Sequence, residues 1–189
     1  MTNYTFDKNK FWYKHRFIDY TIHRRKYVPH TNFMERRVFG YFNDFCLSYI
    51  AYIEMALTFQ QQTRNNRNIF GDRVLAADVI FNYLTNKINV QDLLIDLRPH
   101  VEEFKNKIGS ISARINFTGN DLELLRNWDV NNPETLHSLL QYLYKMRCTF
   151  FHGDKLDFNT MIDVLRPTCQ CLRQINFVLF KAMNKDIGR

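Results

Sequence analysis

The sequence predicts an all-α fold: an antiparallel helical bundle of four to five helices, with a C-terminal αα-hairpin and a basic, aromatic N-terminal extension. Two observations favour this class. Leu, Ile, Val and Phe are plentiful, whereas only 6 Gly and 4 Pro occur in 189 residues, which is typical of a folded, helix-rich chain. Apolar residues also recur at three- and four-residue spacing in several long segments. We expect the extension over residues 1–32 and one helical domain over 33–186.

The N-terminal segment is the most basic part of the chain. Residues 1–40 contain nine Lys/Arg and three Asp/Glu, so they hold 9 − 3 = +6 of the total net charge of +7. Aromatic residues lie between the cations, a pattern that suits a phosphate backbone and stacked bases. Alternatively, the cations are solvated and the aromatics dock onto the domain. Phe17–Ile22 alternates as a short strand would. The candidate nucleic-acid-binding residues are Lys14, Arg16, Arg24, Arg25 and Lys26.

The spacing predicts one long helix over 33–62. Its apolar stripe comprises Phe42, Phe45, Cys46, Tyr49, Ile50, Ile53, Ala56 and Leu57. Glu54 lies at the edge of this stripe. Because buried charges are rare unless paired, we expect Glu54 to support the site by pairing with a cation from another helix, with Arg147 as a candidate. The alternative is an exposed edge glutamate.

The middle of the chain predicts a loop and shorter helices. The polar run 60–68 marks a loop, and helices are expected over 72–86 and about 91–108. Pro99 should kink or restart the second of these helices. Residues 109–120, rich in Ser, Gly and Asn, predict a flexible connection.

The last two helices form the predicted hairpin. Asn132 followed by Pro133 is a helix-start signal, an N-cap and then proline at the first helical position. This helix should run over 133–152, turn tightly at Gly153-Asp154, and be followed by a helix over about 157–184 that Pro167 bends.

Arg147 and His152 near the end of the 133–152 helix are the candidate functional residues. The apolar stripe of that helix is Leu136, Leu139, Leu140, Leu143 and Phe150, and Arg147 lies on it. A guanidinium at a core-facing position needs an acidic partner, a bound anion or a wet cleft. His152 lies about 140° further round an ideal helix. The two can share a site if the helix end unwinds at Gly153, or if a second copy of the chain brings its own pair alongside.

At these residues the sequence resembles a family. The run Tyr144-Lys145-Met146-Arg147-Cys148-Thr149-Phe150-Phe151-His152-Gly153 looks like the signature of HEPN domains, and its aromatic-His-Gly ending is closest to the Apea-like branch. The family pattern is an arginine, a polar residue, two to four further residues and a histidine, at the start of a hairpin turn in an α-bundle. The resemblance covers roughly residues 33–186.

The resemblance implies a homodimer whose two motifs face each other across a cleft, and metal-independent cleavage of RNA without a cofactor. His152 would move the proton of the ribose 2′-hydroxyl or of the leaving 5′-oxygen. Arg147 would stabilise the charge growing on the phosphorane, and the products would carry a 2′,3′-cyclic phosphate. Many such domains act in toxin–antitoxin or phage-defence systems, so an antitoxin or defence-system partner is implied.

Cys148 departs from the family pattern, because a thiol is a weak hydrogen-bonding group where a polar side chain is usual. Asp154 also stands where the nucleotidyltransferase-paired toxins of the superfamily have tyrosine. A second hypothesis is therefore a non-catalytic HEPN-like module that binds RNA, nucleotide or a partner protein through the same cleft. Two further readings stay open: His152 and Gly153 simply end the helix, or Cys148 and His152 form a nucleophile–base pair.

The four cysteines and the apolar runs bear on metals and membranes. Cys169-Gln170-Cys171 is one residue too tight for a zinc knuckle and lacks a partner pair, so we expect packing thiols and no metal. No 18-residue apolar run exists in the sequence, so a membrane span is not expected. The polar start of the chain indicates a cytoplasmic protein.

Overall fold

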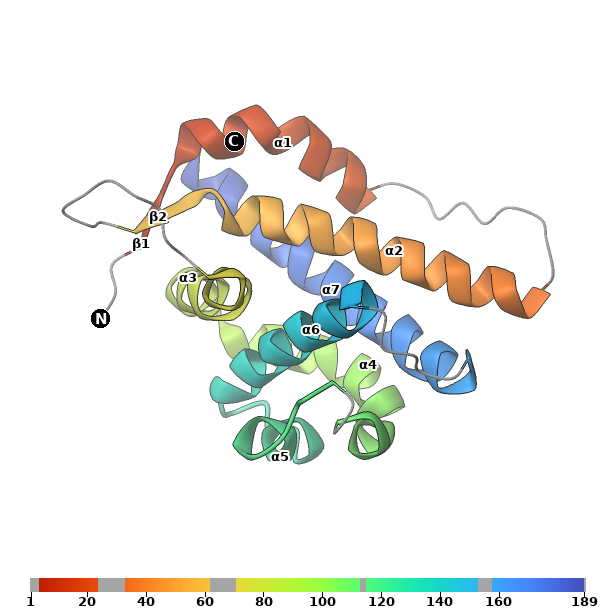
Figure 1. The fold of residues 1–189 in the computed structure, drawn as a ribbon. Helices are drawn as coiled ribbons and strands as arrows, with labels where there is room; N and C mark the ends of the chain where they lie inside the picture. Colours follow the sequence, from red (N-terminus) through yellow and green to blue (C-terminus); the bar gives the residue numbers. More distant parts are fainter. Residues whose placement is uncertain (1–3, 24–32, 62–70, 113–114, 153–157, 189) are drawn as a thin grey trace.

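The structure, a computed structural model, describes residues 4–23, 33–61, 71–112, 115–152 and 158–188. These residues form the predicted all-α bundle, with seven α-helices, one π-helical turn and a single two-stranded sheet. The helices form one body in which α7 (Phe158–Asp186) runs between α2 (Phe33–Ala56) and α4 (Val90–Ile111) and contacts both (Figure 1). The count exceeds the expected four to five because the N-terminal segment and a short stretch before residue 127 also fold into helices.

The N-terminal segment joins the core. It forms β1 (Tyr4–Phe6) and α1 (Lys8–His23), and α1 contacts α2 and α7. Asp7 starts α1, since its Oδ1 accepts a hydrogen bond from the Lys10 backbone N–H at 3.0 Å. Phe11 and Ile18 are both fully buried, a spacing that places them on one face of a helix. The predicted strand over Phe17–Ile22 is therefore wrong, because burial in this segment follows the helical period.

The helix predicted over 33–62 ends earlier, at Ala56. The hydroxyl of Thr58 donates to the carbonyl of Met55 at 2.6 Å, which closes the turn after the helix. The next residues form β2 (Phe59–Gln61), which pairs antiparallel with β1 in the register Phe6↔Phe59. The helix ends before the expected residue because the chain beyond it pairs with β1, more than fifty residues away.

Helices form in the two regions predicted over 72–86 and about 91–108, with somewhat different bounds. The helix expected over 72–86 contains the π-helical turn η1 (Val74–Val79) and α3 (Ile80–Lys87). The helix α4 runs through Pro99 without a break. The carbonyl that Pro99 leaves unbonded belongs to Ile95, whose side chain is 52% exposed, so this side of the helix faces solvent. Within the expected connection, α4 extends to Ile111 and α5 (Asn120–Arg126) begins at its end.

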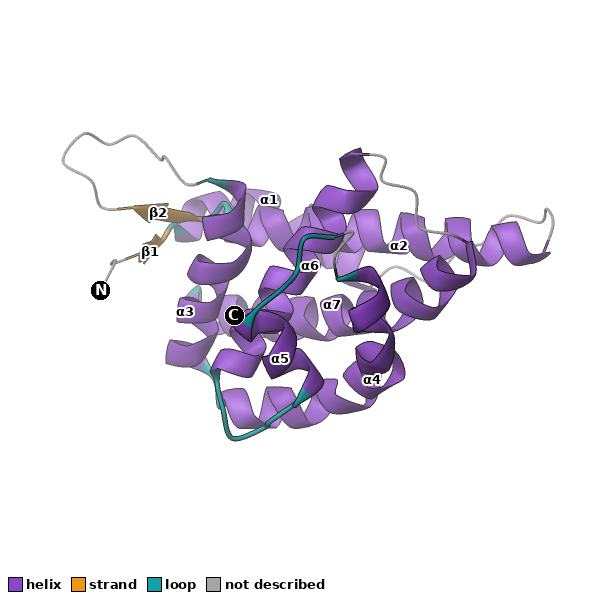
Figure 2. Cartoon of the chain, turned by 60° about the horizontal axis from the view of Figure 1, so that its bottom comes forward, coloured by secondary structure: helices purple, strands orange, loops and turns teal. Residues whose placement is uncertain are grey.

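The bounds of the last two helices match the predicted bounds closely. The helix α6 (Glu134–His152) begins after Asn132, whose Oδ1 accepts from the Glu134 backbone N–H at 3.0 Å, as an N-cap should. The helix α7 continues through Pro167. Because proline has no backbone N–H, the carbonyl of Asp163 receives no helical hydrogen bond from residue 167, and the Asp163 side chain is half-exposed. The predicted turn at Gly153-Asp154 lies outside the described residues. In Figure 2 α6 lies across α7, and Tyr142 of α6 contacts Thr168 of α7.

The chain has one main hydrophobic core, to which all the long helices contribute. Its largest fully buried side chains include Tyr52, Tyr142, Phe11, Phe45 and Phe104. Among the described residues, no helix combines the length and apolar character that crossing a bilayer requires.

Candidate functional site

Arg147 lies on the apolar stripe of α6, as the sequence predicted, and it stands at the edge of the core. Leu136, Leu139, Leu140 and Leu143 of the same stripe are fully buried. The Arg147 side chain is 30% exposed, and its Nη1 lies 3.9 Å from Oδ2 of Asp72, just before η1. Asp72 is 70% exposed, so the pair stands at the border with solvent. A guanidinium on an apolar stripe needs an acidic partner or access to water. Arg147 has a carboxylate partner, Asp72, at the border with solvent.

Sequence reasoning missed Asp72 as the partner. Asp72 stands at the start of the helix expected over 72–86, where aspartate is common because it stabilises the positive end of the helix dipole. That local role gave no sign of a contact with a residue far along the chain. A carboxylate at a helix start that the fold brings beside a motif arginine can be found only once the two helices are placed.

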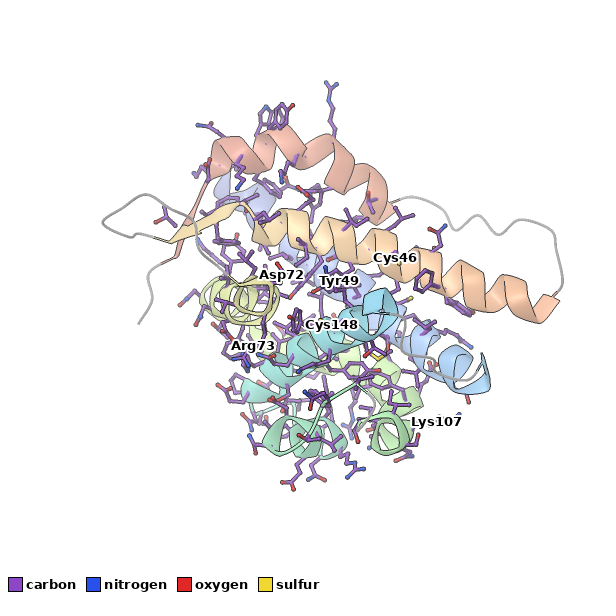
Figure 3. All side chains as sticks on the ribbon, in the orientation of Figure 1. Cys46, Tyr49, Asp72, Arg73, Lys107 and Cys148 are labelled. Atoms are coloured by element: carbon purple, nitrogen blue, oxygen red, sulfur yellow. The ribbon has the colours of Figure 1, made fainter. Side chains whose placement is uncertain are left out.

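The groups around Arg147 come from three elements. Tyr49 of α2 is buried beside α6, and its pKa is influenced by Arg147, Cys148, Tyr144 and Asp72 together. Burial is the largest cause and raises the pKa of Tyr49 well above its usual range, whereas the positive charge of Arg147 lowers it. Figure 3 shows Tyr49, Asp72 and Cys148 around the space where α2, the start of η1 and α6 meet. We call Arg147, Asp72, Tyr49, Tyr144 and Cys148 the Arg147 cluster.

Cys148 and Tyr144 are neighbours one helical turn apart on α6. A hydrogen bond with the Cys148 thiol is the largest of the causes that raise the pKa of the Tyr144 hydroxyl. Cys46 of α2 is half-buried, and burial raises the pKa of its thiol. The position where the resembled family carries a polar side chain is occupied here by a thiol beside the Tyr144 phenol.

His152 is the last residue of α6, which is where the motif predicts it. The structure describes its backbone but not its side chain, and Gly153 lies outside the described residues. Arg147 and His152 are therefore held by one helix, with the Arg147 side chain directed at the meeting point of α2 and η1. That the His152 imidazole shares a site with Arg147 stays a prediction.

Glu54 has a partner from another helix, but the partner differs from the candidate. It forms an ion pair with Lys14 of α1, and both side chains are about one quarter exposed. The proposed pairing of Glu54 with Arg147 is wrong, because α1 covers this part of α2 and brings its own lysine. Among the predicted nucleic-acid-binding residues, Lys14 is engaged in this pair and Arg16 is exposed. Arg24, Arg25 and Lys26 lie outside the described residues.

The cysteines of α7 behave as packing groups. Cys169 and Cys171 are buried, the thiol of Cys169 donates to the Tyr41 carbonyl at 3.2 Å, and burial raises the pKa of Cys171. Within the described segments, no three His, Cys, Asp or Glu side chains gather as ligands of a metal ion would.

Comparisons with known proteins identify no relative of this chain. No family model, no curated protein and no solved structure matches the chain.

The buried phenol of Tyr49 predicts a loss of stability at alkaline pH. Below about pH 10, the ordinary tyrosine pKa, the phenol is neutral in both folded and unfolded chains. Above that pH only the unfolded chain ionises it, because burial raises the pKa in the folded state. Stability is thus fully present below pH 10 and falls as pH rises, by about 1.4 kcal/mol per pH unit for each such group.

Urea unfolding of wild-type and Tyr49→Phe proteins between pH 9 and about pH 11 tests this expectation. The variant has no phenol to ionise at this position, so its stability should fall less steeply than that of the wild type. Equal slopes would mean that Tyr49 ionises as easily in the folded chain as in the unfolded one.

Proposed function

We propose that the chain is a metal-independent endoribonuclease of HEPN type, in which Arg147 and His152 act on the RNA backbone. The observation that carries the proposal is the setting of Arg147. It is a half-buried arginine on the core side of α6, paired at 3.9 Å with an exposed aspartate, five residues before the histidine that ends the helix. A guanidinium at this border with solvent can bind a phosphate oxygen through its planar set of donors.

The chemistry follows from the two side chains. His152 removes the proton of the ribose 2′-hydroxyl as that oxygen attacks the adjacent phosphorus, or protonates the 5′-oxygen as its bond to phosphorus breaks. One histidine serves both steps in turn, or the histidines of two chains share them. Arg147 stabilises the additional negative charge on the phosphorane. The products are a 2′,3′-cyclic phosphate and a free 5′-hydroxyl.

Two chains are part of the proposal. On an ideal helix Arg147 and His152 point about 140° apart, so one helix does not aim both side chains at the same phosphate. A second chain whose motif faces the first would bring its own arginine and histidine to the shared site. The Tyr144 hydroxyl, one helical turn before Cys148 on α6, offers a polar group next to the position where this chain carries a thiol. An antitoxin or a defence-system partner would then restrain the nuclease in the cell.

The alternative is a non-catalytic HEPN-like module that binds RNA, nucleotide or a partner protein at the same place. Cys148 is the observation that favours it, because a thiol orients a reacting group less well than an amide or carboxylate. Retained RNA binding without any cleavage would select this alternative.

Incubation of the purified chain with single-stranded and structured RNAs in the presence of a metal chelator tests the nuclease. We expect cleavage with 2′,3′-cyclic phosphate ends from the wild type and none from His152→Ala, which also controls for contaminating nucleases. The His137→Ala variant is the matched control, because it removes a half-buried histidine from the first turns of the same helix and should keep full activity. Cleavage that survives His152→Ala, or that requires a metal, contradicts the proposal.

The mass in solution tests the shared site. We expect a dimer at micromolar concentration by light scattering. A monomer that cleaves RNA at a rate proportional to its concentration would rule out the two-chain arrangement.

A further inference from the structure

A cavity of about 330 Å³ lies between the end of α3, the N-terminal half of α4 and the C-terminal half of α7. This volume is at the lower end of the range for small-molecule sites, about 300–1,000 Å³. The cavity shares no lining residue with the Arg147 cluster. A ligand in this cavity would therefore bind apart from the proposed cleavage site.

Two lysines on the α7 wall have no carboxylate partner among the described residues. Lys181 and Lys185 both line the cavity one helical turn apart and are exposed. The third lysine, Lys87, is 2.9 Å from a carboxylate oxygen of Asp186, so its charge is matched. Among the described residues, Lys181 and Lys185 form no ion pair. Like charges at this spacing repel each other, and an anion bound between them would relieve the repulsion.

An apolar surface adjoins these lysines. Phe177 lies one turn before Lys181 on α7 and is 37% exposed, one of the few large apolar side chains that the core leaves in solvent. The ammonium of Lys181 lies 4.2 Å from the centre of its ring, and Ile88 and Val178 extend the apolar surface within the cavity. An exposed aromatic ring beside cations is the arrangement with which proteins bind a nucleobase and its phosphate together.

The α4 wall carries a carboxylate. Oδ2 of Asp96 accepts a hydrogen bond from the Gln174 amide at 3.1 Å, and Asp96 lines the cavity on a different helix from the two lysines. A ligand that is only an anion would be repelled by Asp96. A ligand with an anionic end and hydrogen-bond donors suits both walls, and the hydroxyls of a ribose are such donors.

We propose that this cavity binds a nucleotide, with its phosphate at Lys181 and Lys185, its base against Phe177 and its sugar or base donors at Asp96. The nucleotide is either a free molecule or one unit of an RNA strand, and the chemistry that recognises it is the same in both. The site lies outside the Arg147 cluster, and it stands whether or not the chain cleaves RNA.

Titration calorimetry on the full chain tests the site, carried out on His152→Ala protein so that any RNA probe stays intact. The probes are adenosine monophosphate, a short single-stranded oligoadenylate and inorganic phosphate. We expect adenosine monophosphate or the oligoadenylate to bind and inorganic phosphate to bind at least tenfold more weakly. Binding of the mononucleotide identifies a free nucleotide as the ligand, and binding of the oligoadenylate alone identifies a strand.

The variants locate the site. Lys181→Ala/Lys185→Ala and Phe177→Ala should each weaken nucleotide binding by about tenfold or more, the effect of losing charge-assisted or stacking contacts. The matched control, Lys105→Ala/Lys107→Ala on α4, removes the same charge away from the cavity and should leave binding unchanged. The proposal is overturned if no nucleotide probe binds at millimolar concentration, if inorganic phosphate binds as well as the nucleotide, or if the control weakens binding as much as the cavity variants.

Discussion

On the proposed ribonuclease mechanism, replacing Arg147 by alanine should slow RNA cleavage by about 10²–10³-fold, the usual cost of removing one group that stabilises charge in a transition state. The physical reason is that the phosphorane carries more negative charge than the substrate, and only a fixed cation nearby offsets it. Because the interaction strengthens in the transition state, the loss should appear in kcat as well as in kcat/KM. Single-turnover rates on a defined RNA measure it.

Two companion variants sharpen this test. Arg147→Lys keeps the charge but loses the planar fork, so its rate should lie between those of the wild type and Arg147→Ala. Asp72→Asn removes the carboxylate that competes with RNA for Arg147, so it should keep activity and bind RNA at least as tightly as the wild type. Asp72 is 70% exposed, and its loss should change stability by less than about 1 kcal/mol.

Arg98→Ala on α4 is the control for a general effect of charge, since its side chain is 61% exposed. It should leave the cleavage rate unchanged. If Arg147→Ala melts at the wild-type temperature and still cleaves within a few-fold of the wild-type rate, Arg147 has no part in the chemistry. The non-catalytic alternative would then gain support if RNA binding, but not cleavage, depended on Arg147.

Replacing Tyr142 by alanine should destabilise the fold by about 3–5 kcal/mol, the usual cost of truncating a large buried aromatic side chain. Tyr142 is fully buried on α6. Its ring stacks on Phe104 at 5.2 Å and meets the edge of Phe117 at 5.7 Å. Its hydroxyl contacts Thr168 of α7 at 3.2 Å. One side chain thus joins α6 to both α4 and α7, and its removal leaves a cavity that all three helices line.

Tyr142→Phe is the matched variant, because it keeps the ring and removes only the hydroxyl. Thr168 retains its bond to the Val164 carbonyl at 2.6 Å, so the cost should be about 0.5–1.5 kcal/mol. Urea unfolding at neutral pH measures both values. A loss below about 1 kcal/mol for Tyr142→Ala would mean that the helices close over the cavity, and that the stack on Phe104 is not what holds α6 in place.

Local sequence signals fixed the parts of the fold in which neighbouring residues settle the outcome. The start of α6 follows from Asn132 and Pro133, because a side-chain cap and a preset φ angle act within one turn. The burial of the leucine stripe on α6 and the position of Arg147 on it follow from the helical period. His152 is the last described residue of α6. These features needed no knowledge of other helices.

The errors share a different cause. Phe17–Ile22 alternates like a strand but is helical, because contact with α2 and α7 buries Phe11 and Ile18 together. Residues beyond Ala56 leave the helix to pair with β1. Pro99 does not restart α4, because the carbonyl that it leaves unbonded lies on an exposed side of the helix. In each case a contact with a distant segment or with solvent outweighed a weak local preference.

By itself, the sequence determined the helical class, the helix that carries the motif and the face on which Arg147 lies, since periodicity and capping act locally. Only the tertiary structure decided which charges meet. The tertiary structure pairs Lys14 with Glu54 and Asp72 with Arg147, and it brings residues of α3, α4 and α7 together around the cavity. A charge at the edge of the core pairs with whatever partner the helix arrangement brings within a few ångströms, and that arrangement is set by the packing of the whole core.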